Sequence, residues 1–290
     1  MTVGPRGGGE GGAVRLAAGP VMSGPTPETN VTTLARLLIA MALVTSTARA
    51  EIVTRTVEYR AGDTVLEGLV SYDTAGPARK PGVLVVHDWM GVGPFVRARA
   101  EQLAGLGYVA FAADVYGKGV RPASVGEASR QAGALKADRP LLRARVAAGL
   151  AELRRQPNVL PARVAAIGYC FGGTAALELA RSGAEVTGVV SFHGGLDSPT
   201  PADARAVKAK ILALHGADDP FVPPAEVQAF EDEMRGGGVD WQLVVYSGAV
   251  HSFTNPAAGN DNSRGAAYNA TADRRSWLAM RAFFAEVLGP

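Results

Sequence analysis

The sequence predicts an α/β protein with one mostly parallel, doubly wound sheet, an antiparallel hairpin at its N-terminal side and helices on both faces. Three observations support this prediction. Two segments of alternating polarity open the body of the chain after residue 50, short apolar segments follow, and helix-like segments separate them. Regular alternation of buried strands with helices is typical of a parallel sheet that is covered on both faces.

The elements follow from their periodicity. Residues 52–59 and 64–71 alternate in polarity around a turn that contains Gly62, which predicts the hairpin. Six later segments, most of them continuously apolar, are expected to be strands, at residues 82–87, 108–113, 163–168, 186–192, 210–215 and 241–246. Helices are expected between and after them, at residues 94–106, 123–137, 140–156, 171–181, 224–236 and 271–288. Residues 51–290 are therefore predicted to form a single domain.

The first fifty residues are predicted to form a disordered leader followed by a signal peptide. Residues 1–30 are rich in Gly, Pro and Thr and have no apolar periodicity, so we expect disorder there. Arg36, the apolar run 37–44 and the small residues up to Ala50 match a secretory signal peptide, which predicts export to the periplasm or the medium. A short buried helix or an uncleaved anchor is the alternative, and Met22 is an alternative start.

Composition limits the partners. The 290-residue chain has 29 basic and 27 acidic residues, and four Arg and two Glu lie in the first fifty, so the body is neutral. A neutral body without a basic cluster argues against nucleic-acid binding. We expect a monomer, with no stable membrane association once the signal peptide is removed. The chain has one cysteine, so no internal disulfide can form.

That cysteine, Cys170, lies in the motif Gly-Tyr-Cys-Phe-Gly-Gly at residues 168–173, between a predicted strand and a predicted helix. The G-x-S-x-G nucleophile elbow has the same context, with a strained turn that exposes the nucleophile. The helix N-terminus would favour a Cys170 thiolate, and the N–H of Phe171 would face a developing oxyanion. The alternative is that Cys170 is a small buried apolar residue and the glycines only allow close packing.

A base and an orienting acid are expected after the nucleophile in the chain. His251 follows the strand at 241–246 and is the predicted base. Asp219 follows the strand at 210–215 and is favoured as the acid over the adjacent Asp218, which would be a turn or cap residue. Both follow the carboxyl ends of strands, where open α/β sheets place their sites. The other histidines are expected to hold loops by hydrogen bonds; they are His87, His193 and His215.

The loop after the strand at 82–87 is expected to supply the second oxyanion donor. The backbone N–H of Trp89 is the predicted donor. Asp88, beside it, is a carboxylate close to the expected thiol position. It would either regulate the protonation of Cys170 or cap the turn that follows.

Five segments of the body are distinctive when they are taken together. They are residues 87–92 (His-Asp-Trp-Met-Gly-Val), 113–117 (Ala-Asp-Val-Tyr-Gly), 168–173, 216–223 and 251–253 (His-Ser-Phe). Together they resemble the dienelactone hydrolase family, and the resemblance covers roughly residues 52–288. The resemblance implies an α/β-hydrolase fold and a Cys-His-Asp triad at Cys170, His251 and Asp219. Family members typically carry a glutamate, which takes the thiol proton, where this chain has the shorter Asp88.

The sequence therefore predicts a hydrolase that cleaves a small-molecule carboxylic ester or lactone through an acyl-thioester on Cys170. No metal-binding motif such as HExxH is present, so we expect no metal and no cofactor. Two alternatives stay open. One is a general carboxylesterase or thioesterase of the same fold, and the other is a non-catalytic protein of this fold that binds a ligand or partner.

Overall fold

The computed structural model describes residues 13, 15–24 and 51–289, and the chain divides into two units, residues 1–47 and 48–290. Residues 13 and 15–24 form no helix or strand and are exposed. The signal peptide predicted up to Ala50, and much of the disorder predicted for residues 1–30, lie outside the described residues. No helix in the described part of the chain has the length and apolar character that a membrane span requires.

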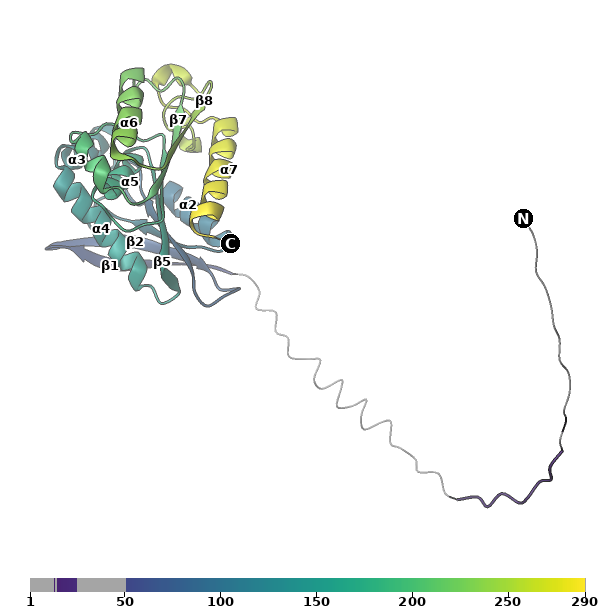
Figure 1. Cartoon of the computed structure of the whole chain (residues 1–290). Helices are drawn as coiled ribbons and strands as arrows, with labels where there is room; N and C mark the ends of the chain where they lie inside the picture. The colour runs from purple at the N-terminus through teal and green to yellow at the C-terminus, as the bar shows by residue number, and fades with distance from the viewer. Residues whose placement is uncertain (1–12, 14, 25–50, 290) are drawn as a thin grey trace, which may run out of the picture. The chain divides into compact units, whose positions relative to one another are not determined.

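One eight-stranded sheet organises the second unit, in the order β1-β2-β4-β3-β5-β6-β7-β8 (Figure 1). β1 is antiparallel to β2, β2 is antiparallel to β4, and every other neighbouring pair is parallel. The strands are β1 (Ile52–Ala61), β2 (Thr64–Asp73), β3 (Lys80–Val86), β4 (Val109–Ala113), β5 (Val159–Tyr169), β6 (Gly188–Phe192), β7 (Lys210–Gly216) and β8 (Trp241–Tyr246). The predicted mostly parallel sheet with an N-terminal hairpin is confirmed.

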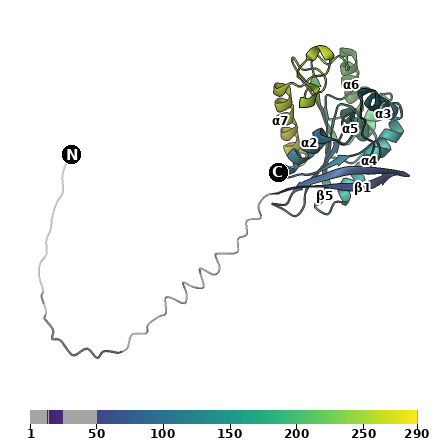
Figure 2. The ribbon, with the colours of Figure 1, turned by 180° about the vertical axis from the view of Figure 1, so that it is seen from behind.

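Helices cover both faces of this sheet, as predicted (Figures 1 and 2). One face is covered by α2 (Pro94–Gly105) and α7 (Ala270–Val287). The other is covered by α3 (Val125–Ala137), α4 (Arg139–Arg155), α5 (Phe171–Arg181) and α6 (Pro224–Gly237). Three short 3-10 helices lie in loops, η1 (Pro201–Ala206), η2 (Pro256–Ala258) and η3 (Asn262–Arg264).

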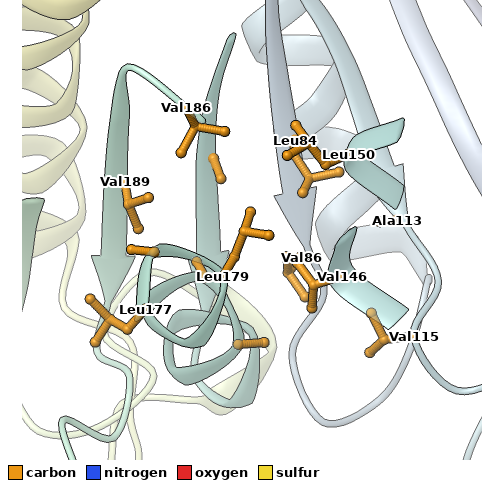
Figure 3. Close-up of a cluster of buried hydrophobic side chains, with 14 of the residues drawn as sticks. Leu84, Val86, Ala113, Val115, Val146, Leu150, Leu177, Leu179, Val186 and Val189 are labelled. Atoms are coloured by element: carbon orange, nitrogen blue, oxygen red, sulfur yellow. The ribbon is translucent and has the colours of Figure 1, made fainter. Parts of the chain in front are cut away.

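The two helical layers explain why the central strands are apolar at most positions. Successive side chains of a strand point to opposite faces, so in β3 Val83 and Val85 pack towards α2 and α7, while Leu84 and Val86 pack towards α4 and α5. Figure 3 shows the second group lying against Val146 of α4 and its neighbours. Such burial on both faces contributes roughly 1.5–3 kcal/mol per large aliphatic side chain.

The structure extends β5 beyond its prediction. The strand was expected at residues 163–168 but begins at Val159, ahead of Pro161. Its pairing with β3 shifts register, because Pro81 is opposite Leu160 whereas Gly82 is opposite Val164. A proline donates no backbone hydrogen bond, and the irregularity lets the strand continue past it. At the other end of β5 the chain turns directly into α5, and this junction carries Cys170.

Candidate active site

The candidate residues gather at the carboxyl edge of the sheet. Asp88 and Trp89 follow β3, Cys170 follows β5, Asp219 follows β7 and His251 follows β8. These strands run parallel through the middle and one side of the sheet, so the loops that follow them emerge at the same edge. The fold therefore brings together residues that lie far apart in the sequence.

Cys170 occupies a strained turn. Its φ is 55° and its ψ is −120°, a backbone conformation that residues with a side chain rarely adopt. The two flanking glycines make this turn possible. A Cβ atom on Gly168 would lie 1.8 Å from the carbonyl oxygen of Gly172, and one on Gly172 would lie 2.3 Å from that of Val86. The strand can thus turn sharply into α5, with the thiol at the junction.

A continuous line of polar contacts links the thiol to a buried carboxylate. His251 Nε2 lies 3.0 Å from Cys170 Sγ, and His251 Nδ1 lies 2.8 Å from Asp219 Oδ2. The other carboxylate oxygen of Asp219 accepts the N–H of Phe221 at 2.9 Å, which holds the carboxylate in place. The side chain of Asp219 is 0% exposed and that of His251 is 12% exposed. The line is therefore largely shielded from water.

The neighbours of His251 set its protonation. Burial lowers the pKa of His251, but the charge on Cys170 and the hydrogen bonds to Asp219 and Cys170 raise it, and the pKa is raised to about 10 overall. A protonated imidazole between a thiolate and a carboxylate is stabilised by both. A cysteine attacks a carbonyl as the thiolate, and an imidazolium at this position would stabilise that form.

The structure separates the two adjacent aspartates as the sequence suggested. Asp219 is buried against His251, whereas Asp218 is exposed at the turn. The backbone N–H of Asp218 donates to the carbonyl of Ala249, at 3.0 Å, so this residue links the loop after β7 to the loop after β8.

Two backbone N–H groups, those of Phe171 and Trp89, lie in the segments that directly follow β5 and β3 at this edge of the sheet. Neither Phe171 N–H, at the start of α5, nor Trp89 N–H donates to an acceptor within residues 51–289. The loop that carries Trp89 is held firmly, because the Tyr116 hydroxyl donates to the Trp89 carbonyl at 3.0 Å and Met90 N–H donates to Asp88 Oδ1 at 2.8 Å. Both groups are the oxyanion donors expected from the sequence, and that role stays a prediction.

The carboxylate of Asp88 caps the turn that follows it. It accepts the Met90 N–H, and no hydrogen bond joins it to Cys170 among the described residues. Burial raises the pKa of Asp88, although the bond from Met90 and the charge of His251 act in the opposite direction. The contacts therefore match the turn-capping alternative.

Comparison with known proteins shows to which family this chain belongs. A family model described as the dienelactone hydrolase family matches residues 67–288, which is more than half of the chain. The protein belongs to this family. It is thus a dienelactone hydrolase-like hydrolase, and the resemblance seen in its motifs is confirmed.

Relatives cover most of this hydrolase. Protein usf of Aquifex pyrophilus is 30% identical over 214 residues, which span 72% of this chain and 89% of that protein. The solved structure named m3DLH is 42% identical with a TM-score of 0.79, covering 81% of this chain and 98% of that one. A dienelactone hydrolase-like promiscuous phosphotriesterase from metagenomic libraries is 40% identical with a TM-score of 0.77 and the same coverage.

The remaining histidines of the hydrolase differ from one another. His87 holds a loop as expected: Nδ1–H donates to the Asp88 carbonyl at 2.5 Å, and Nε2 accepts Val115 N–H at 3.2 Å. Burial lowers the pKa of His87 to about 4, so the ring is neutral. His215 departs from expectation, because its buried Nδ1 has no hydrogen-bond partner within residues 51–289.

The sequence does not predict the side chains that hold the loops of the site by hydrogen bonds. Tyr116 holds the Trp89 loop, and Thr254 bonds to His193 at 2.8 Å. Nothing in local periodicity marks a tyrosine or threonine as a partner of residues far away in the chain. The sequence shows that His193 directly follows a buried strand and therefore lies at the edge of the sheet. It does not show which residues His193 contacts.

Proposed function

We propose that this hydrolase cleaves carboxylic esters or lactones through an acyl-thioester on Cys170. The observation that carries the proposal is the unbroken line from Cys170 Sγ through His251 to Asp219, with contacts of 3.0 and 2.8 Å. A nucleophile, a base and an orienting acid in hydrogen-bond contact are what acyl transfer requires.

In the first half of the reaction, the Cys170 thiolate attacks the carbonyl carbon and a C–S bond forms. The carbonyl oxygen becomes an oxyanion, which the N–H groups of Phe171 and Trp89 stabilise; removing one such donor typically costs about 3–4 kcal/mol. As the C–O bond to the alcohol breaks, His251 transfers its proton from Nε2 to the leaving oxygen. A lactone keeps both fragments on the enzyme as one acyl chain.

In the second half of the reaction, His251 acts as a base instead of an acid. The acylated Cys170 carries no charge, so its charge and its hydrogen bond no longer raise the pKa of His251, and only Asp219 still raises it. His251 is then a neutral base that takes a proton from water, and the hydroxide attacks the thioester. The C–S bond breaks, the carboxylic acid leaves, and the proton on Nε2 restores the imidazolium–thiolate pair.

A substrate panel tests this proposal. Purified protein is assayed on matched lactones, linear alkyl esters, thioesters and an activated phosphotriester, with Cys170→Ala in parallel. The phosphotriester is included because a 40% identical relative is named for that activity. We expect ester or lactone turnover that Cys170→Ala abolishes. A preference for linear esters or thioesters would favour the general esterase alternative, and no turnover on the whole panel would favour the binding protein.

The proposal extends to the form of the protein in the cell. We propose that a signal peptide ending near Ala50 directs export, and that the exported domain, residues 51–290, acts as a monomer. N-terminal sequencing of protein from the periplasm or medium tests the first point, with a start near Glu51 expected. Light scattering of the same material tests the second.

A further inference from the structure

The strained residues of the structure identify a fourth side chain at the site. In the described part of the chain, three residues other than glycine have a positive φ: Cys170 at 55°, His193 at 40° and Ser252 at 58°. Cys170 is the proposed nucleophile, and Ser252 directly follows the proposed base, His251. Such strain persists where the surrounding structure enforces it, and it concentrates at functional sites. His193, which follows β6 between the strands that carry Cys170 and Asp219, requires its own explanation.

The ring of His193 connects Cys170 to the loop after β8 that carries His251 and Thr254, which we call the base loop. Its Nδ1 accepts the backbone N–H of Cys170 at 3.2 Å, and the carbonyl of Phe192 shares this N–H at 3.0 Å. The Nε2 of His193 lies 2.8 Å from the hydroxyl of Thr254. Thr254 is three residues after His251, and the two imidazole rings meet edge to face with their centroids 5.2 Å apart. His193 is 2% exposed, so these contacts are made in the protein interior.

The hydrogen bonds determine which form of the ring is present. Because Nδ1 accepts a hydrogen bond from an N–H, it carries no proton itself, and the neutral ring then has its proton on Nε2. Nε2–H therefore donates to Thr254 Oγ1. Burial lowers the pKa of His193 well below its ordinary value, and the charge of His251 lowers it further, in agreement with a neutral ring.

Thr254 is itself fixed from the far side. Its carbonyl accepts a hydrogen bond from Arg99 Nη2 at 2.7 Å, and Arg99 also forms an ion pair with Asp273 of α7 at 2.6 Å. The base loop is thus anchored to α2 and α7, and His193 connects that anchored loop to the amide of the nucleophile.

We propose that His193 is a positioning residue, which holds the strained amide of Cys170 in register with the loop of His251 and so keeps the Sγ–Nε2 contact in its reactive geometry. The inference rests on the proposed function, because it assigns His193 a part in the same reaction. A displacement of reacting groups by about 1 Å can reduce turnover about 100-fold.

Substitutions at Thr254 test the bridge without changing the strained backbone of His193. Thr254→Val removes the hydroxyl that accepts from Nε2, and Thr254→Ser keeps it. Thr187→Val is the matched control, since it removes a hydroxyl that donates to the Val164 carbonyl at 3.1 Å, before β6 and away from the carboxyl edge. We expect a lower kcat with an unchanged KM for Thr254→Val, recovery in Thr254→Ser, and no change in Thr187→Val.

Substitutions at His193 test the other half of the bridge. His193→Asn keeps an acceptor near the position of Nδ1 and tolerates a positive φ, whereas His193→Leu keeps no hydrogen bond. We expect His193→Leu to lower kcat about 100-fold and His193→Asn to retain more of it. Since His193→Asn already lacks Nε2, adding Thr254→Val should have little further effect, which is the non-additivity expected of residues that act together.

Alkylation of the thiol by iodoacetamide gives a readout that needs no substrate. Cys170 is the only cysteine in the chain, so the alkylation rate reports on it alone. We expect slower alkylation in His193→Leu and Thr254→Val, with melting temperatures that show folded protein. Unchanged kcat and alkylation in folded variants would overturn the inference, and if His193→Leu does not fold, the Thr254 variants decide. Slowed alkylation in a protein that hydrolyses no ester would instead overturn the proposed function alone.

Discussion

At the scale of single residues, the carboxylate of Asp219 acts together with the charge of Cys170 on how the site responds to pH. Its hydrogen bond to His251 is one cause of the raised pKa of that imidazole, and its own burial prevents water from replacing the contact. Removing the charge therefore changes two quantities together, the orientation of the ring and the pH at which the ring loses its proton.

We expect Asp219→Asn to lower kcat/KM on an alkyl ester by roughly 10³- to 10⁴-fold, as loss of the orienting acid does in serine triads. In the unmodified protein kcat/KM should fall as the pH rises through about 10, because His251 then lacks the proton for the leaving alcohol. Asp219→Asn removes a cause that raises this pKa, so the fall should move to lower pH.

A p-nitrophenyl ester is the control for this pH profile. Its leaving group needs no proton from His251, so the fall at high pH should be weak or absent. The same fall on both substrates, or a fall that Asp219→Asn moves to higher pH, would contradict the role given to His251.

Asp88 provides a second test at this scale. Because its Oδ1 accepts Met90 N–H, Asp88→Asn should preserve the turn and most of kcat/KM. Asp88→Ala should loosen the loop that presents Trp89 N–H and lower kcat/KM five- to tenfold. This corresponds to about 1 kcal/mol, the typical contribution of a capping side chain. If Asp88→Asn instead abolished alkylation of Cys170, the carboxylate would be acting on the thiol proton.

At the scale of elements, the junction of β5 and α5 depends on close backbone contact. Gly172 lies against the carbonyls of Val86 and His87, which end β3 and begin its loop, so a methyl group there has no space. The junction therefore joins three features of the site: the strained nucleophile, the start of α5 and the loop that carries Trp89.

We expect Gly172→Ala to destabilise the protein by about 3 kcal/mol or more through overpacking against backbone atoms. Gly133→Ala is the matched control, because Gly133 lies in α3 with nothing within 4 Å of the added Cβ. That change should stabilise the protein by roughly 0.5–1 kcal/mol through helix propensity. Urea unfolding of both variants measures the difference, and equal stabilities would contradict the packing argument.

The sequence predicts most elements because buried parallel strands are nearly continuous apolar segments, and because the apolar residues of helices recur every three to four positions. It places Cys170, Asp219 and His251 because each follows a recognisable strand. It does not predict that β5 begins at Val159, because Pro161 disfavours a strand locally and the register shift against Pro81 is a tertiary effect. For the same reason it does not reveal the contact between His193 and Thr254.

At the scale of the whole molecule, a buried ionic cluster joins α5 to α6. Arg181 of α5 bonds to both carboxylate oxygens of Glu233 in α6, at 2.9 and 2.7 Å, and to Glu178 at 2.9 Å. These side chains are at most 2% exposed. The same arginine also donates to the carbonyl of Leu196, in the loop that follows His193.

We expect Arg181→Met to destabilise the protein by about 3–5 kcal/mol, because it leaves the buried carboxylate of Glu233 without its partner, whereas Glu178 keeps Arg143. Lys208→Met is the control, since the Lys208–Glu185 ion pair is exposed and should contribute little. Thermal unfolding should show a Tm lowered by roughly 10 °C in the first variant and unchanged in the second. Equal melting temperatures would show that the cluster does not support the fold.

The acyl-enzyme itself is the most direct test of how the whole molecule functions. Protein mixed with an activated acyl ester is quenched in acid within the first turnover, and its intact mass and peptides are measured. The account predicts a mass increase equal to the acyl group, located at Cys170, removed by hydroxylamine and absent in Cys170→Ala. Turnover with the acyl group on another residue, or undiminished turnover in Cys170→Ala, would contradict it.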